Sequence, residues 1–142
     1  MKVIPYISFK GNCEAAVSFY QSILGGELNI IRFKDLPEEE SGDYSVSKEW
    51  EEKIMHCLLS LDNGALIYFG DTWENTELIT GTNSAIHLNV DSEKEVYKFV
   101  EQLSKEGEVT MEADKVFWGS VYGSVIDKFG IQWGIEFQLP SE

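Results

Sequence analysis

The sequence predicts an α+β fold, in which two βαβββ modules form a curved mixed sheet around a central cup and the helices cover the outer face. Two observations predict this fold. The order strand-helix-strand-strand-strand occurs twice along the chain, and residues of similar type coincide when one half is shifted onto the other. The coinciding pairs are Phe19 with Phe99, Ile23 with Leu103 and Pro5 with Ala85 at a shift of 80, and Gly64 with Gly130 and Tyr68 with Gly134 at a shift of 66.

The first module is expected at about residues 1–71. A strand over Lys2–Lys10 contains Pro5, which lacks a backbone donor and therefore indicates an edge or a module junction. Asn12 is expected to cap a helix that runs to about Leu24 and has an apolar stripe. The remaining strands are expected at Glu27–Lys34, Met55–Leu61 and Ala65–Gly70, with Asp62-Asn63-Gly64 turning the last hairpin.

An acidic, irregular segment over Asp35–Lys53 interrupts the first module. Its length and its content of Glu, Ser and Gly predict a long loop. Such a loop either closes over a site as a lid or remains a solvated surface segment, and both interpretations stay open.

The second module is expected at about residues 83–138. It starts with a strand over Ala85–Val90, and a helix follows from Ser92 to Lys105, where the spacing of Ser92 and Glu95 is typical of a capping box. The remaining strands are expected at Val109–Met111, Val116–Ile126 and Ile131–Phe137, with Asp127-Lys128-Phe129-Gly130 as the turn of the closing hairpin.

Composition bounds the class of protein. The 142 residues are expected to form a single domain, 1–142, made of the two modules. No apolar run is long enough for a membrane span, and no secretion signal precedes the first strand. The two cysteines, Cys13 and Cys57, are too few for a disulfide framework. We therefore expect a cytoplasmic protein without a membrane partner.

The net charge of −14 restricts the partners. Phosphate backbones would be repelled, so nucleic acid is not expected as a partner. A cationic small molecule would be attracted. The alternative interpretation is that the charge only maintains solubility.

The duplicated module resembles the vicinal oxygen chelate superfamily, which includes glyoxalase I, bleomycin-resistance proteins and extradiol dioxygenases. The motifs Phe117-Trp118-Gly119 and Asp127-Lys128-Phe129-Gly130, followed by Trp133, resemble its PhnB-like branch, also labelled demethylubiquinone methyltransferase-like. Because no Gly-rich turn of the kind that cradles a nucleotide cofactor is visible, we discount methyl transfer. The resemblance also implies a symmetric homodimer.

Metal-dependent members of that superfamily place a His or Glu at matching points on the first and last strands of each module. Carried over to this sequence, the points fall on Pro5, Tyr68, Ala85 and Gly134. None of these residues offers a charged or imidazole ligand, so no cofactor is expected. A divalent metal held by His87 and Glu136, with a third ligand, is the disfavoured alternative.

Strand alternation selects His87 and Glu136 as candidate catalytic residues. The first and last strands of such a module run parallel and adjacent, which places the two side chains on the cup face at similar depth. We expect them to approach within hydrogen-bond or one-water distance. A carboxylate that orients an imidazole suits proton abstraction near neutral pH. Alternatively, the two groups only satisfy each other in a polar cup without turnover.

Five further residues are candidates for substrate binding, because they offer hydroxyl groups, amides or a ring face to the cup: Tyr68, Asn89, Trp118, Tyr122 and Gln132. For Trp118 and Trp133, core packing is the competing interpretation. His56 either lines the first module's half of the cup or lies at the surface. Cys57 is expected on the buried side of its strand, and Cys13 is taken as structural.

Three functions remain open. The first is a small-molecule binding protein whose cup lacks the usual metal ligands. The second is a lyase or isomerase of the glyoxalase type that uses His87 and Glu136, with or without a metal. The third is an accessory protein whose cup has lost its ligand.

Overall fold

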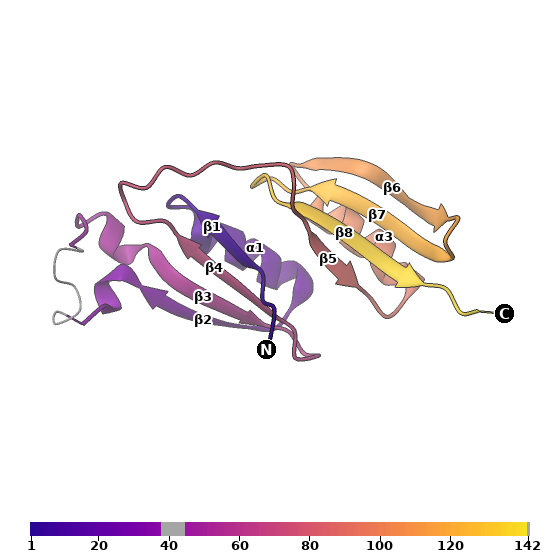
Figure 1. Cartoon of the computed structure of the whole chain (residues 1–142), viewed down its shortest axis with the longest axis horizontal. Helices are drawn as coiled ribbons and strands as arrows, with labels where there is room; N and C mark the ends of the chain where they lie inside the picture. The colour runs from indigo at the N-terminus through magenta and orange to yellow at the C-terminus, as the bar shows by residue number, and fades with distance from the viewer. Residues whose placement is uncertain (38–44, 142) are drawn as a thin grey trace. The chain divides into compact units, whose positions relative to one another are not determined.

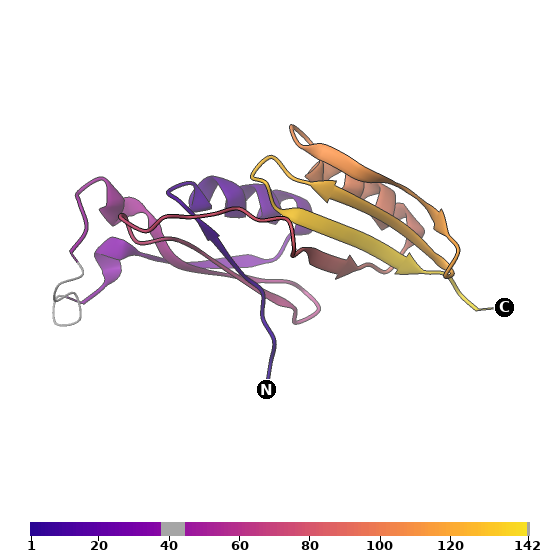
Figure 2. The same ribbon diagram turned by 45° about the horizontal axis from the view of Figure 1, so that its top comes forward.

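The computed structural model describes residues 1–37 and 45–141. The chain divides into two compact units, Met1–Ile79 and Thr80–Glu142, which are described here one at a time. Each unit contains one four-stranded mixed sheet and one long helix (Figure 1), and Figure 2 shows that each helix covers one face of its own sheet. Neither helix has the length and hydropathy that crossing a membrane requires, within the described residues.

Unit 1 has the strand order β1-β4-β3-β2, in which β1 runs parallel to β4 and the other pairs are antiparallel. Helix α1 makes the crossover between strands and packs its buried residues on the sheet, where the ring of Tyr20 stacks on Phe69. The elements are β1 (Tyr6–Phe9), α1 (Cys13–Leu24), β2 (Glu27–Arg32), the 3₁₀ helices η1 (Phe33–Asp35) and η2 (Trp50–Glu52), β3 (Ile54–Ser60) and β4 (Leu66–Asp71).

Unit 2 repeats this topology with the order β5-β8-β7-β6, and β5 runs parallel to β8. Its elements are β5 (Ile86–Asn89), α3 (Glu93–Leu103), β6 (Glu108–Val116), β7 (Ser120–Ile126) and β8 (Gln132–Gln138). The core between α3 and the sheet includes Ile86, Val96, Val100, Leu103, Val121, Val125, Trp133 and Ile135. The predicted cap of α3 is confirmed, since the Ser92 hydroxyl accepts a hydrogen bond from the Glu95 amide at 3.2 Å.

The predicted α+β class with two βαβββ modules is confirmed. Among the described residues, the mixed sheet takes the form of two four-stranded sheets, one in each unit. The expectation of a cup shared by the two modules concerns how the units lie against each other, and it stays a prediction.

The shift that relates the two modules differs between their elements. Both hairpin turns carry the same hydrogen bonds, Gly64 N to the Leu61 carbonyl and Gly130 N to the Asp127 carbonyl, so the shift of 66 is correct for the last two strands. The first helical residues, Cys13 and Glu93, and two buried pairs, Ala16 with Val96 and Tyr20 with Val100, follow the shift of 80. Buried Val17, however, falls on exposed Tyr97.

The first strands, however, are related by 81 residues. Tyr6 lies opposite Tyr68 in unit 1, whereas His87 lies opposite Gly134 in unit 2. The predicted equivalence of Pro5 and Ala85 is therefore wrong by one residue, and a slip of one residue turns a strand's side chains to the other face. The counterpart of Tyr6 is His87.

The predicted strand over Val116–Ile126 is also wrong at its start. Residues Phe117–Gly119 form the turn between β6 and β7, where the Gly119 amide donates to the Val116 carbonyl at 3.1 Å. Gly119 has φ +87°, a left-handed conformation that glycine adopts without the steric cost of a β-carbon. The turn leaves Trp118 half exposed, so the expectation that this residue packs in the core is wrong.

The acidic segment Asp35–Lys53 is described only at its two ends. Its first residue belongs to η1, and the 3₁₀ helix η2 lies near its other end. Residues 38–44 lie outside the described part of the chain, and the expectation of a lid falls largely on them.

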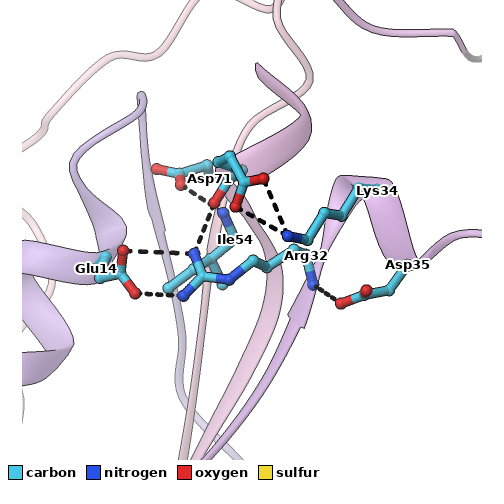
Figure 3. A network of polar contacts seen from close by, with 7 residues as sticks. Glu14, Arg32, Lys34, Asp35, Ile54 and Asp71 are labelled. Atoms are coloured by element: carbon cyan, nitrogen blue, oxygen red, sulfur yellow. Dashed lines mark hydrogen bonds and ion pairs between the residues drawn. The ribbon is translucent and has the colours of Figure 1, made fainter. Parts of the chain in front are cut away.

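A buried carboxylate, Asp71, connects the start of α1 to the sheet of unit 1. One oxygen accepts hydrogen bonds from the amides of Gly11 (2.7 Å) and Cys13 (3.0 Å), and the other accepts from the Ile54 amide (3.0 Å; Figure 3). Asn12 precedes the helix but makes no side-chain cap bond, so its predicted role as the capping side chain is wrong. Asp71 supplies the acceptor instead.

An exposed set of ion pairs surrounds this anchor. Arg32 reaches both carboxylate oxygens of Glu14 on α1 and also donates to the Glu52 carbonyl, while Lys34 pairs with the Glu52 carboxylate at 2.9 Å (Figure 3). Because these pairs are exposed to water and salt, they contribute far less than the buried Asp71 contacts.

Both cysteines are buried and free. Burial raises the pKa of the Cys57 thiol to about 11. The pKa of Cys13 is raised further, by burial first and then by the neighbouring charge of Asp71. The expectations that Cys57 lies on the buried side and that Cys13 is structural agree with this burial.

We predict that Asp71→Asn destabilises the protein by about 1–3 kcal/mol, because the amide nitrogen either faces a buried backbone donor or leaves one without an acceptor. The exposed variant Glu52→Gln, the control, should cost at most about 1 kcal/mol. Urea denaturation followed by circular dichroism measures both. Equal midpoints for Asp71→Asn and the wild type would contradict the anchoring role.

Candidate functional site

The candidate site lies on the face of the unit 2 sheet that points away from α3, which we name the open face. Alternation along β5 and β8 defines it: Ile86 and Trp133 are buried on the helix side, and their neighbours project to the other side. The open-face positions used below are His87 and Asn89 on β5, Gln132, Gly134 and Glu136 on β8, and Ser120 and Tyr122 on β7.

His87 and Glu136 lie close together on this face. The distance from His87 Nε2 to Glu136 Oε2 is 3.6 Å, which confirms the predicted proximity. The predicted similar depth is wrong, because the register pairs Glu136 with Asn89 and His87 with Gly134, two residues apart along the strands. The His87 ring therefore extends along the strand toward Glu136. Its side chain is 47% exposed and that of Glu136 is 22% exposed, so a ligand can reach both.

Ser120 fixes the orientation of the Glu136 carboxylate. Its hydroxyl donates a hydrogen bond of 2.9 Å to Glu136 Oε1, which leaves Oε2 directed toward the imidazole. Ser120 itself is buried. Ser120 is not among the candidates predicted from the sequence, although its place on the strand, two residues before Tyr122, is the alternation signal that would have found it.

Two aromatic rings lie next to this polar group. The Tyr122 ring is nearly parallel to the His87 ring, with centroids 6.2 Å apart and an angle of 18°. The ring centroids of Trp118 and Tyr122 are 6.0 Å apart, and Trp118 belongs to the exposed turn that precedes β7. Beneath the pair is Gly134, where an added β-carbon would lie 3.0 Å from His87 Nδ1 and 3.2 Å from the Tyr122 hydroxyl oxygen. The glycine thus makes room for both rings.

The remaining predicted binding residues are placed differently. Asn89 is exposed on the open face. Gln132 donates to the Ser84 carbonyl at 2.9 Å. Tyr68 belongs to unit 1, where its ring meets those of Tyr6 and His56. The binding roles proposed for these three residues stay predictions.

The described residues do not provide the donor set that a divalent metal usually needs. No group of three or more His, Cys, Asp or Glu side chains comes together among residues 1–37 and 45–141. On the open face, the residue opposite His87 on β8 is Gly134, and the residue opposite Glu136 on β5 is Asn89. Neither supplies a charged or imidazole ligand. A structural or catalytic metal normally has at least three protein ligands, so these residues fit such an ion poorly.

Comparison with known proteins identifies the family. The model of the glyoxalase/bleomycin resistance protein/dioxygenase superfamily matches residues 4–135. The chain belongs to this superfamily, as the resemblance of its duplicated module implied.

Among individual proteins, the chain is similar to Protein YjdN of Escherichia coli K12, with 30% identity over 95% of this chain and 94% of that protein. The crystal structure of PA1353 from Pseudomonas aeruginosa matches with a TM-score of 0.85 and 29% identity, covering 99% of both chains. A Bacillus cereus structure named as a putative 3-demethylubiquinone-9 3-methyltransferase, PhnB protein, matches with a TM-score of 0.73 and 21% identity, covering 96% of this chain and 99% of that one. These neighbours agree with the PhnB-like branch.

The two tryptophans of unit 2 should differ in hydrogen exchange. The Trp133 indole N–H is buried and donates to Asp127 Oδ2 at 2.8 Å, whereas Trp118 is 51% exposed. We predict that the Trp133 indole signal persists for hours in D₂O and that of Trp118 disappears within minutes, as NMR spectra can follow. Slow exchange of Trp118 would contradict its exposure at the turn.

Proposed function

We propose that the protein binds a small cationic organic molecule on the open face of unit 2. The observation that carries this proposal is the oriented carboxylate of Glu136, held by Ser120 on one oxygen and directed toward exposed His87 with the other. A carboxylate prepared in this way is an acceptor for a charge-assisted hydrogen bond.

The neighbouring rings support the same proposal. Tyr122 and Trp118 add apolar surface beside the charged group, and small-molecule sites typically combine aromatic surface with a few placed polar groups. A cation also interacts favourably with the faces of such rings. The overall charge of −14 would raise the local concentration of a cationic guest.

A binding screen tests this proposal. We expect amine- and amidine-bearing compounds at saturating concentration to raise the melting temperature, because a guest that binds only the folded state stabilises it by about 3 kcal/mol at 100 times Kd. Glu136→Gln should weaken the dissociation constant of each hit, measured by calorimetry, at least about tenfold. Glu112→Gln, which removes an exposed charge on β6, is the control and should leave it unchanged.

Amide NMR spectra locate the bound guest in that screen. Shifts at His87, Ser120 and Glu136 support the proposal. If no compound perturbs these residues, or if the two Gln variants weaken binding equally, the open face is not the binding site.

A second candidate function is proton abstraction by His87, with Glu136 as the residue that orients it. The 3.6 Å contact between the imidazole Nε2 and the carboxylate supports it. In such a reaction the neutral imidazole removes a proton from a carbon next to a carbonyl group, and the carboxylate stabilises the resulting imidazolium.

Deuterium exchange tests this second function. With hydroxyacetone in D₂O, the wild type should exchange the protons next to the carbonyl group at least about 100 times faster than His87→Ala, as measured by ¹H NMR. Tyr97→Phe on the exposed face of α3 is the control. If the wild type and His87→Ala show the same rate, His87 is not a base for this class of substrate.

The cytoplasmic location, the homodimer and the exclusion of a metal stay predictions beside these two functions. The printed name of the Bacillus cereus structure describes that protein, and at 21% identity it supports only the fold of this chain.

A further inference from the structure

Each unit has one tyrosine and one histidine at two equivalent strand positions. The residue that is tyrosine in unit 1 is histidine in unit 2, and the reverse holds for the other position. With the shift of 81 for the first strands, Tyr6 corresponds to His87. With the shift of 66 for the hairpin strands, His56 corresponds to Tyr122. Each unit therefore places one tyrosine and one histidine ring together, with centroids 5.8 Å apart in unit 1 and 6.2 Å apart in unit 2.

A third point differs between the units. In unit 1 it is Tyr68, whose ring lies edge-on to Tyr6 (6.3 Å, 90°) and to His56 (4.8 Å, 79°). Edge-to-face contacts at these distances are favourable for aromatic rings. In unit 2 the same point is Gly134, so the third ring has no counterpart.

We propose that unit 2 takes the third ring from its guest: a planar aromatic group contacts His87 and Tyr122 as the Tyr68 ring contacts Tyr6 and His56 in unit 1. This inference rests on the proposed binding function and names the class of ligand, an aromatic cation. Glu136 lies two residues beyond Gly134 on the same face, about 7 Å along the strand. An amidinium nitrogen about 4 Å from its ring centre, with a hydrogen bond of about 3 Å to the carboxylate, covers that distance.

A guest ring over Gly134 requires the His87 and Tyr122 rings to move, because they occupy that space in the structure. Both rings are at the ends of side chains that can rotate, and no backbone atom is among the nearest contacts of the glycine. The half-exposed Trp118 beside Tyr122 extends the aromatic surface.

Three probes of matched size test the ring and the charge separately: benzamidinium, cyclohexanecarboxamidinium and benzoate. We expect benzamidinium to shift the amide signals of His87, Tyr122 and Gly134 in NMR titrations. Its dissociation constant should be at least about tenfold lower than those of the saturated cation and the aromatic anion.

Gly134→Tyr supplies the missing ring from the protein itself. Gly134 is not among the glycines with positive φ, so its backbone conformation suits any residue, and the added ring requires only the neighbouring His87 and Tyr122 side chains to shift. The variant should fold, with the wild-type amide spectrum outside the open face, and should weaken benzamidinium binding at least about tenfold. Gln102→Tyr, which adds the same ring on α3, on the other side of the sheet, is the matched control and should leave binding unchanged.

The outcomes separate the two proposals. If guests from the wider screen bind at His87 and Glu136 but the saturated cation binds as well as benzamidinium, the ring inference is overturned and the binding function stands. Unchanged benzamidinium binding in Gly134→Tyr overturns the inference in the same way. If no guest of any class reaches the open face, the proposed function itself fails.

Discussion

The parallel pairing of β5 with β8 is the constraint on which the candidate site depends. Parallel neighbours need a crossover, here made by α3 and the following hairpin, so the first and last strands of the unit become adjacent although they are distant in sequence. The register then decides which side chains meet. Because His87 lies opposite Gly134, its ring can extend over the glycine and reach the carboxylate of Glu136 from an offset position.

Asp71 and Asp127 differ from Glu136 in how their carboxylates are hydrogen-bonded. Asp71 and Asp127 are buried, and each accepts three hydrogen bonds from donors of its own unit, two or three of them backbone amides. Such groups stabilise turns and helix starts. Glu136 instead receives one hydroxyl donor and leaves an oxygen near an exposed imidazole. This difference in hydrogen bonding is the reason why we propose binding at Glu136 rather than at the buried aspartates.

Much of the fold could be predicted from the sequence, because its signals are local. The Asp-Asn-Gly and Asp-Lys-Phe-Gly turns and the Ser92–Glu95 cap each depend on neighbouring residues. The one-residue slip between the first strands was not predictable, because strand register is set by long-range pairing. The role of Asp71 was missed for the same reason, since its partners at Gly11 and Cys13 lie far away in sequence, whereas Ser120 could have been found from strand alternation. The proximity of His87 and Glu136 could be predicted because alternation and parallel adjacency constrain it, whereas the exposure of Trp118 depends on a turn that resembled a strand.

The most direct measurement for this account is a ¹³C-edited NOESY spectrum of the isotope-labelled protein. The register of β5 against β8 predicts strong NOEs between the Gly134 α-protons and the His87 ring, together with NOEs from the Tyr122 ring. NOEs from the Gly134 α-protons to the Ala85 methyl group in place of the His87 ring would contradict the account, because they would place His87 away from both the glycine and the carboxylate.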